Sequence, residues 1–364
     1  MTDGEIVFLN AFSTIPGVGA VTMRALKDHF GSYEAAWRAD TVQYAAVHLD
    51  TSARVALMAG KRMVHPAGAL RRVAETGAWM MAEDDPLYPP LLKHIHSPPA
   101  ILYGKGQKSA LTPEICGIAV VGTRRPTPYG ISAAEHIVQG LTYAGITVIS
   151  GLATGIDTKA HKTVLEHGGT TVAVLGSGID SASLFPPENR MLAERIAQSP
   201  GAVISEYAPG TPAVKEHFPM RNRIIAGLAR GTLVVEAREK SGALITARSA
   251  LEENRDVFAV PGSIFSAVSA GPNRLIREGA RVALGHGDIL EELGIVAPSA
   301  VHETHHESLT EKERMILGLM EHPLGIDDIR EQTRLPVPEI MATLSLLELK
   351  QMVRGVGGDI FQKV

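Results

Sequence analysis

The sequence predicts an α/β fold built around a parallel β-sheet. Short apolar runs rich in valine and isoleucine recur along the middle of the chain, and the first two lead directly into glycine turns and helical patterns. Strand–turn–helix units of this kind pack side by side as a parallel sheet covered by helices on both faces. The predicted strands are Ile118–Val121, Ile146–Ile149, Thr171–Leu175, Ala202–Ser205, Thr232–Glu236 and Val257–Val260, with Arg281–Leu284 as a candidate edge strand.

Composition indicates a soluble protein of two or three domains in a reducing cytoplasm. The 364 residues include one cysteine, Cys116, which cannot form an intrachain disulfide. Residues 1–10 lack the basic start of a signal peptide, and no apolar run approaches the roughly 20 residues of a membrane helix. With 35 Lys+Arg against 39 Asp+Glu, the net charge is −4. Any nucleic-acid site must therefore be a local basic patch, because the chain as a whole is acidic.

Helical patterns fill the N-terminal part of the chain. Leu9–Phe30 has apolar residues at helical spacing on both sides of a Pro16–Gly19 turn, which resembles a helix–hairpin–helix; a tight turn inside a small helical bundle is the alternative. Two more helical patterns follow, Ala35–Ala46 and Ala53–Glu75, and the second must be interrupted by its internal proline.

A proline-rich connector, Asp84–Pro99, follows and is expected to lack regular structure. It contains His94 and His96, but no further metal ligand stands at a suitable spacing, so we interpret the pair as part of a surface turn.

Near the C-terminus, residues 296–308 have the composition of a solvated linker. Adventitious metal binding is the less favoured interpretation of its polar cluster, which consists of His302, Glu303, His305 and Glu307.

Residues 309–364 have the pattern of a winged helix. Thr310 and Glu313 form a capping box at the start of a helix, two more helical segments follow as a helix-turn-helix, and Met352–Phe361 resembles a hairpin. The second helix of such a pair normally reads the major groove. Here it carries two or three acids and one base, so we expect a packing or protein-contact role.

Glycine turns with basic residues follow the predicted strands. Gly122 to Arg125 follows the first strand and Gly151–Gly155 the second, so both turns lie at the carboxyl edge of the sheet, where α/β proteins bind ligands. Backbone N–H groups at helix N-termini favour anions, and Arg124 and Arg125 add full charges, so the ligand should carry phosphate. The G-x-G-x-x-G loop of dinucleotide folds is matched only in part, at Gly176–Ser181, and no P-loop is present.

A basic loop follows the fourth strand. Arg221 and Arg223 flank Asn222 just before an apolar helix, and buried arginines require a carboxylate or a phosphate as partner. Glu206 and Glu236 are candidate carboxylate partners, so a purely structural network is the alternative to phosphate binding.

These motifs carry a resemblance to a known family. The stretches VGTRRPTPYG, SGLATGIDTKAH, VLGSGID, SEY, FPMRNRIIAGL, SGALITARSALEENRDVFAVPG and GPNRLIREGA resemble the DNA-processing protein A family (DprA, also called Smf), in the same order and over almost the whole chain. The resemblance implies an extended Rossmann-like core, an N-terminal helical domain of helix-hairpin-helix or SAM-like type, and a C-terminal winged helix. It also implies a non-enzymatic homodimer that binds single-stranded DNA and loads the RecA recombinase during natural transformation. No cofactor or metal is expected. The implied domains are residues 1–82, 83–295 and 309–364, with 296–308 as linker.

The expected single-strand site combines a basic groove with a stacking face. Phe218 is the best-placed aromatic, ahead of Tyr129 and Phe265. The family often has a basic residue where this chain has Thr154, and Lys159 on the following helix could restore that charge. The predicted DNA-binding residues are Gly122, Thr123, Arg124, Gly151, Gly155, Lys159, Phe218, Arg221, Asn222, Arg223, Lys240 and Ser241.

Two other functional classes stay open at this point. A Rossmann-like nucleotide phosphoribohydrolase would carry a P-G-G-x-G-T-x-x-E signature, which the chain lacks at Pro261–Ile264. Asp157 and His161 could form an acid–base pair at helical spacing, although capping of the helix is the better interpretation of Asp157. A pure scaffold, with every arginine paired internally, is the third class.

Overall fold

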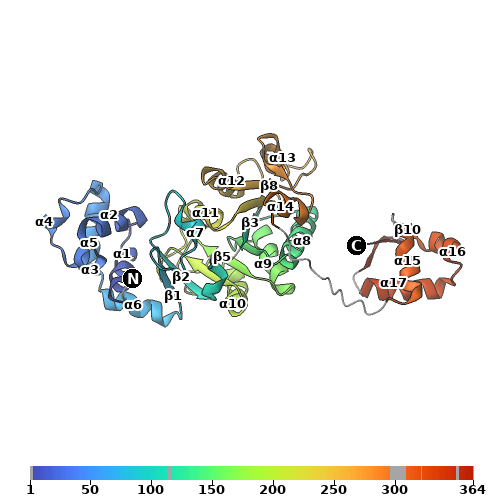
Figure 1. The fold of residues 1–364 in the computed structure, drawn as a ribbon, viewed down its shortest axis with the longest axis horizontal. Coiled ribbons are helices and arrows are strands. Elements are labelled where there is room, and N and C mark those ends of the chain that lie inside the picture. The colour runs from blue at the N-terminus through green and yellow to red at the C-terminus, as the bar shows by residue number, and fades with distance from the viewer. Residues whose placement is uncertain (1–2, 113–115, 296–308, 321, 350–351, 364) are drawn as a thin grey trace. The chain divides into compact units, whose positions relative to one another are not determined.

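The computed structural model describes residues 3–112, 116–295, 309–320, 322–349 and 352–363 (Figure 1). Contacts divide the chain into two compact units, Met1–Pro298 and Ser299–Val364. The predicted linker at 296–308, with its histidines and glutamates, lies outside the described residues.

The N-terminal part of the first unit is helical, as predicted. The turn after the first helix contains Gly17 in the left-handed region, with φ of 84°, and Pro66 is the first residue of a new helix, which confirms the predicted interruption. The predicted helix Ala35–Ala46 is split by Asp40, whose side chain caps a new short helix. The helices are α1 (Asp3–Ser13), α2 (Ala20–Phe30), α3 (Tyr33–Arg38), α4 (Thr41–Tyr44), α5 (Thr51–Met63) and α6 (Pro66–Glu75).

The sheet confirms the predicted α/β fold, with a mainly parallel order β1-β2-β6-β5-β4-β3-β7-β8-β9. Strands β3 to β9 are parallel to one another, and the sheet is extended at β6 by β2, which pairs antiparallel with β6, and then by β1, which pairs antiparallel with β2. The sequence did not predict β1 or β2. The strands are β1 (Trp79–Ala82), β2 (Ile101–Gly106), β3 (Gly117–Val121), β4 (Thr147–Ser150), β5 (Thr171–Leu175), β6 (Ala202–Ser205), β7 (Gly231–Val234), β8 (Asp256–Ala259) and β9 (Arg281–Val282).

Helices cover both faces of this sheet because alternate strand residues point to opposite sides. On β3, Ile118 and Val120 pack with α8, α9 and α14, whereas Ala119 and Val121 pack with α11 and α12. The connecting helices are α7 (Pro90–Lys93), α8 (Pro128–Tyr143), α9 (Ile156–Glu166), α10 (Arg190–Gln198), α11 (His217–Leu228), α12 (Gly242–Glu252), α13 (Ala270–Arg277) and α14 (His286–Glu292), with 3₁₀ turns η1 (Lys108–Leu111) and η2 (Pro187–Asn189).

The N-terminal helices share a hydrophobic cluster with the sheet. Leu9 and Phe12 of α1 belong to the same cluster of buried side chains as Ala173 of β5 and Val203 of β6. The hydroxyl of Tyr103 on β2 donates a hydrogen bond of 2.7 Å to the Asn10 side chain. The first unit therefore has a core that runs from the N-terminal helices into the sheet.

The second unit has the predicted winged-helix arrangement. The predicted capping box is present, since Thr310 accepts from the Glu313 amide at 3.3 Å and the Glu313 side chain accepts in return. Ile316, Ile329 and Leu344 form its core. Its elements are α15 (Glu311–Leu319), β10 (Leu324–Gly325), α16 (Ile326–Thr333), α17 (Val337–Leu349), β11 (Val353–Gly357) and β12 (Ile360–Lys363). In the described parts of both units, no helix has the length and apolar character needed to cross a membrane.

Candidate nucleic-acid interface

A cleft opens at the point where the strand order reverses. From β3 the chain builds the sheet outward through β4, β5 and β6, and then returns to the other side of β3 as β7. Ligands in open α/β sheets bind beyond the carboxyl ends of the strands at such a point. The cleft has a volume of about 510 Å³ and is lined by Val121, Gly122, Arg124, Ala153, Asp157, Phe185, Lys215, Phe218, Pro219, Arg221, Asn222, Ile225, Ser241, Gly242, Ala243, Ile245 and Thr246.

The turns after β3 and β4 are in direct contact with each other. The Ile156 amide donates a hydrogen bond of 3.2 Å to the carbonyl of Thr123. Gly155 has φ of 85°, and a Cβ atom there would lie 2.3 Å from the same carbonyl oxygen. Only glycine permits this approach, so the two turns are fixed together at one edge of the cleft.

Glu236, at the end of β7, holds the turn after β3 in place. Its backbone carbonyl accepts from the Thr123 amide at 2.7 Å, and its carboxylate accepts from the amide and hydroxyl of Thr127 at 2.9 and 2.6 Å. Thr127 in turn caps α8. Of the two candidate partners for the arginines, Glu236 is thus committed to this turn, whereas Glu206 forms an ion pair with Arg223.

Arg221 lies at the floor of the cleft and is 5% exposed. Its guanidinium donates to the carbonyls of Gly151, at 2.7 Å, and Val174, and so ties together the ends of β4 and β5. The Asp157 carboxylate accepts from the amides of Gly151 and Ala153 at 3.1 and 3.3 Å, which is a turn-capping role. Burial raises the pKa of Asp157 above the usual carboxyl range, and the nearby Arg221 charge offsets this only in part.

His161 is buried behind this floor. The Thr171 hydroxyl donates to the carbonyl of Val148 at 2.7 Å, so at its 2.7 Å contact with His161 Nδ1 it must accept the hydrogen bond. Nδ1 therefore carries the proton, and Nε2 has no hydrogen-bond partner among the described residues. Burial, followed by the charge of Arg221, lowers the pKa of His161 to about 3. His161 does not line the cleft, and it does not contact Asp157 as an acid–base pair among the hydrogen bonds of the described residues.

Two phenylalanines and an arginine form the open surface of the cleft. The Arg124 guanidinium lies 5.8 Å from the ring centroid of Phe218, and the Phe185 ring lies 5.7 Å from Phe218 on a tilt of 57°. Phe185 is 44% exposed. Arg124 is exposed and has no carboxylate within 4.0 Å among the described residues. This cluster offers a free cation beside two ring faces, which is the combination that binds a phosphate and its base.

The other predicted site residues have different surroundings. Asn222 lines the cleft and donates to the Gly242 carbonyl at 3.3 Å, while Ser241 caps α12 with its hydroxyl. Lys159 forms an ion pair of 2.9 Å with Glu135, and Lys240 is exposed; neither is among the lining residues. Whether these residues contact DNA stays a prediction.

Two cleft side chains that add an aromatic face and a positive charge, Phe185 and Lys215, were not predicted from the sequence. Phe185 belongs to the segment between β5 and α10, and Lys215 immediately precedes α11, so neither stands in a glycine turn directly after a strand. Neither residue carried a signal in the sequence, and Lys215, which is followed by Glu216, lies outside the acid-free stretch from His217 to Arg230.

The fold and the cleft together define an α/β protein of Rossmann-like type with a cationic, aromatic edge. Residues 79–294 match the family model described as DNA recombination-mediator protein A, and residues 300–359 match the DprA winged helix domain. The chain is a member of the DNA recombination-mediator protein A (DprA/Smf) family.

Relatives and solved structures agree with this membership. The chain is 34% identical to Protein Smf of Synechocystis over the full length of both chains, and 44% identical to DNA processing protein DprA of Bacillus subtilis over 57% of this chain and 68% of that protein. DprA from Streptococcus pneumoniae superposes with a TM-score of 0.68 at 34% identity, covering 80% of this chain and 98% of that one. The structure of Helicobacter pylori DNA processing protein A, which describes its single-stranded DNA binding mode, gives a TM-score of 0.53 at 26% identity and covers 59% of this chain and 95% of that one.

Proposed function

We propose that this protein binds single-stranded DNA without sequence preference in the cleft at the carboxyl edge of its sheet. The observation that carries the proposal is the Arg124–Phe218–Phe185 cluster at the cleft. A guanidinium binds phosphate whatever the base, and a phenylalanine ring stacks on any unpaired base. The cluster should therefore bind single strands of any sequence. The single-strand binding of the Helicobacter pylori relative supports the same reading.

A preference for single strands over duplex follows from the geometry. The cleft consists of narrow turns, and bases can stack on Phe218 and Phe185 only when they are unpaired. Titration of three 30-nucleotide strands of different sequence and one duplex, each at several salt concentrations, tests the proposal. We expect similar affinities for the strands and weaker binding of the duplex. Equal affinity for the duplex would refute it.

The proposal extends to RecA loading by a homodimer in the cytoplasm, with no catalytic step and no cofactor. Family membership supports these points, and the β9 edge supports dimerisation, because it exposes the apolar side chains of Val282 and Leu284. Two linked single-strand sites would raise the apparent affinity through effective concentration. Light scattering at micromolar protein that gives the monomer mass of 38.8 kDa would contradict the dimer. Failure to accelerate RecA filament formation on coated single strands would contradict loading.

A further inference from the structure

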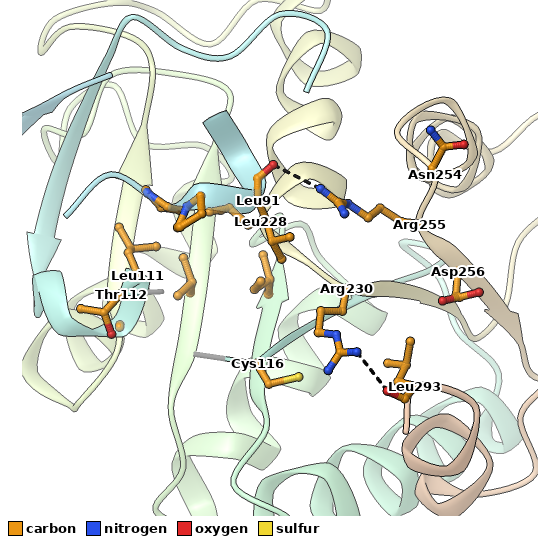
Figure 2. A pocket seen from close by; sticks show the side chains of 15 residues that line it. Leu91, Leu111, Thr112, Cys116, Leu228, Arg230, Asn254, Arg255, Asp256 and Leu293 are labelled. Carbon is orange, nitrogen blue, oxygen red and sulfur yellow. Dashed lines mark hydrogen bonds between the residues drawn. The ribbon is translucent and has the colours of Figure 1, made fainter. Parts of the chain in front are cut away.

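A second cavity lies at the opposite edge of the sheet, where the parallel strands begin. Its volume is about 470 Å³, close to the 510 Å³ of the cleft at the carboxyl edge. Figure 2 shows the side chains that line it. Three of its lining residues, Cys116, Arg230 and Arg255, stand directly before strands β3, β7 and β8. The end of α11 and the connector around α7 also line it. It shares no lining residue with the cleft described above.

The walls of this amino-edge cavity are mainly aliphatic. Ile149, Val172 and Leu228 form its inner wall and are each at most 7% exposed. Among the described residues that line it, none is aromatic. The lining residues are Pro89, Pro90, Leu91, Ala110, Leu111, Thr112, Cys116, Ile149, Val172, Leu228, Arg230, Asn254, Arg255, Asp256 and Leu293.

Two arginines add positive charge to this aliphatic cavity. Arg255 donates to the carbonyl of Leu91 at 3.3 Å and Arg230 to the carbonyl of Leu293 at 3.0 Å, and Figure 2 shows each guanidinium directed at that oxygen. These bonds use one of the five N–H groups of each side chain. The Nε–H group of Arg255 is buried without a hydrogen-bond partner among the described residues.

Neither arginine forms an ion pair with a carboxylate within the described part of the chain. Asp256 also lines the cavity, yet it lies beyond 4.0 Å from both guanidinium groups. A buried donor without a partner costs about 1–3 kcal/mol, and such a group calls for an explanation. The buried donor without a partner belongs to Arg255 alone, since Arg230 is exposed. Carboxylates from outside the chain would add a charged partner for each guanidinium.

We propose that the amino-edge cavity binds a peptide segment of a partner protein, with an apolar side chain against the aliphatic wall and flanking carboxylates on Arg230 and Arg255. The absence of aromatic residues from the described lining argues against a nucleic-acid strand, whose bases bind by stacking. Charge complementarity argues for acidic residues, and the aliphatic wall for a leucine-like side chain. Because the two sites lie at opposite edges of the sheet, the partner and the single strand can be bound together.

The alternative role for the arginines is purely structural. Arg230 and Arg255 follow the ends of α11 and α12, where helix C-termini favour cations. In that case the two side chains serve only the carbonyls of Leu293 and Leu91. The experiment below separates the two roles.

Cys116 supplies the measurement, because it is the sole cysteine of the chain and lines the cavity. The rate of its alkylation by neutral iodoacetamide is followed by mass spectrometry on the full-length protein. The probe is an octapeptide of alternating glutamate and leucine; one control peptide has lysine for glutamate and another has serine for leucine. We expect half-maximal protection below about 1 mM for the probe alone, and none from the controls.

Matched variants assign the protection to the arginines. Arg230→Gln and Arg255→Gln should each weaken it by about tenfold, whereas Arg248→Gln, an exposed arginine of α12 outside the cavity, should not change it. If Arg255→Gln lowers the melting temperature, its weaker protection does not separate loss of peptide binding from loss of stability. Arg230 is exposed, so Arg230→Gln then decides whether the arginines bind the peptide.

Four results would overturn the proposal. They are no protection at about 1 mM probe, equal protection by the lysine peptide, unchanged protection in Arg230→Gln, and protection of Cys116 by a single-stranded oligonucleotide. Unchanged protection in Arg230→Gln would show that the arginines serve only the carbonyls of Leu293 and Leu91. Protection by the oligonucleotide would show that the cavity binds nucleic acid.

Discussion

Arg124→Ala tests the proposed DNA site most directly. Arg124 is exposed at the turn after β3, lies over the Phe218 ring, and has no carboxylate within 4.0 Å in the described chain. Its guanidinium is therefore available to a phosphate. The variant removes one charge without removing a structural ion pair, so DNA binding should change while stability stays nearly constant.

The expected size of each effect follows from these contacts. One phosphate contact contributes about 0.7 to the slope of log K against log salt for a single strand. Between 50 and 200 mM salt, wild-type affinity should then fall about 2.6 times further than that of the variant. Loss of a charge-assisted hydrogen bond, at about 1.5–3 kcal/mol, should weaken binding at low salt by about tenfold or more. Loss of the exposed Phe218 contact costs the fold at most about 1 kcal/mol.

Fluorescence anisotropy with a labelled 30-nucleotide strand measures the slope, and a thermal melt measures the stability. Arg125→Ala is the matched control, because Arg125 is the exposed neighbour of Arg124 and does not line the cleft. Its slope should stay close to the wild-type value.

Two outcomes would refute the reasoning about Arg124. An unchanged slope with a clearly lower melting temperature would show that the side chain stabilises the fold and does not bind phosphate. The same loss of slope in Arg125→Ala would show that only the general charge of the turn matters.

Three further predictions concern other parts of the structure. Phe185→Ala should weaken single-strand affinity by about tenfold, the contribution of one base stack, whereas Phe265→Ala, outside the cleft, should not; anisotropy titration decides. His161 is buried with a pKa near 3; since the unfolded state alone takes up its proton below about pH 6.5, its contribution to stability should fall by about 2 kcal/mol between pH 7.5 and 5. Buried Asp157, whose pKa is raised to about 6, acts in the opposite direction, so the His161 contribution is read as the difference between wild type and His161→Gln in the pH dependence of urea unfolding. Deletion of Leu309–Val364 should leave the circular dichroism and the single-strand affinity of the remainder intact, since the two units have separate cores; loss of binding with an intact spectrum would contradict this.

Local sequence patterns predicted the parallel sheet because its inner strands are mainly apolar runs followed by turns. The pattern failed at β1 and β2. Trp79–Ala82 leads into the proline-rich connector and not into a glycine turn and a helix, and Ile101–Gly106 follows that connector and contains two glycines. Neither therefore has the strand–turn–helix signature of a parallel strand. Their order in the sheet comes from long-range pairing, for which the local sequence carries no signal.

The sequence predicted the positions of the turns in the candidate site better than the contacts of its side chains. Gly122, Gly155 and Arg124 lie where the glycine-turn argument put them, because parallel strands bring their carboxyl ends to one edge. Arg221 shows the limit of reading charge from sequence, since its partners are backbone carbonyls of β4 and β5 that only the fold brings together. Phe185 reaches the cleft from a loop far away in the chain, which a single sequence does not reveal.

The hydrophobic cluster shared by α1 and the sheet gives a different domain boundary from the one that the family match gives. The family match begins at residue 79, so a boundary drawn from the family model would exclude the helices before it. The hydrophobic core has no boundary there, because Leu9 and Phe12 belong to the same buried cluster as Ala173 and Val203, and the Asn10 side chain accepts a hydrogen bond from the buried Tyr103 hydroxyl. A fragment cut at residue 79 would leave that hydroxyl without its partner and open an apolar face to water, whereas the intact first unit should melt in one calorimetric transition.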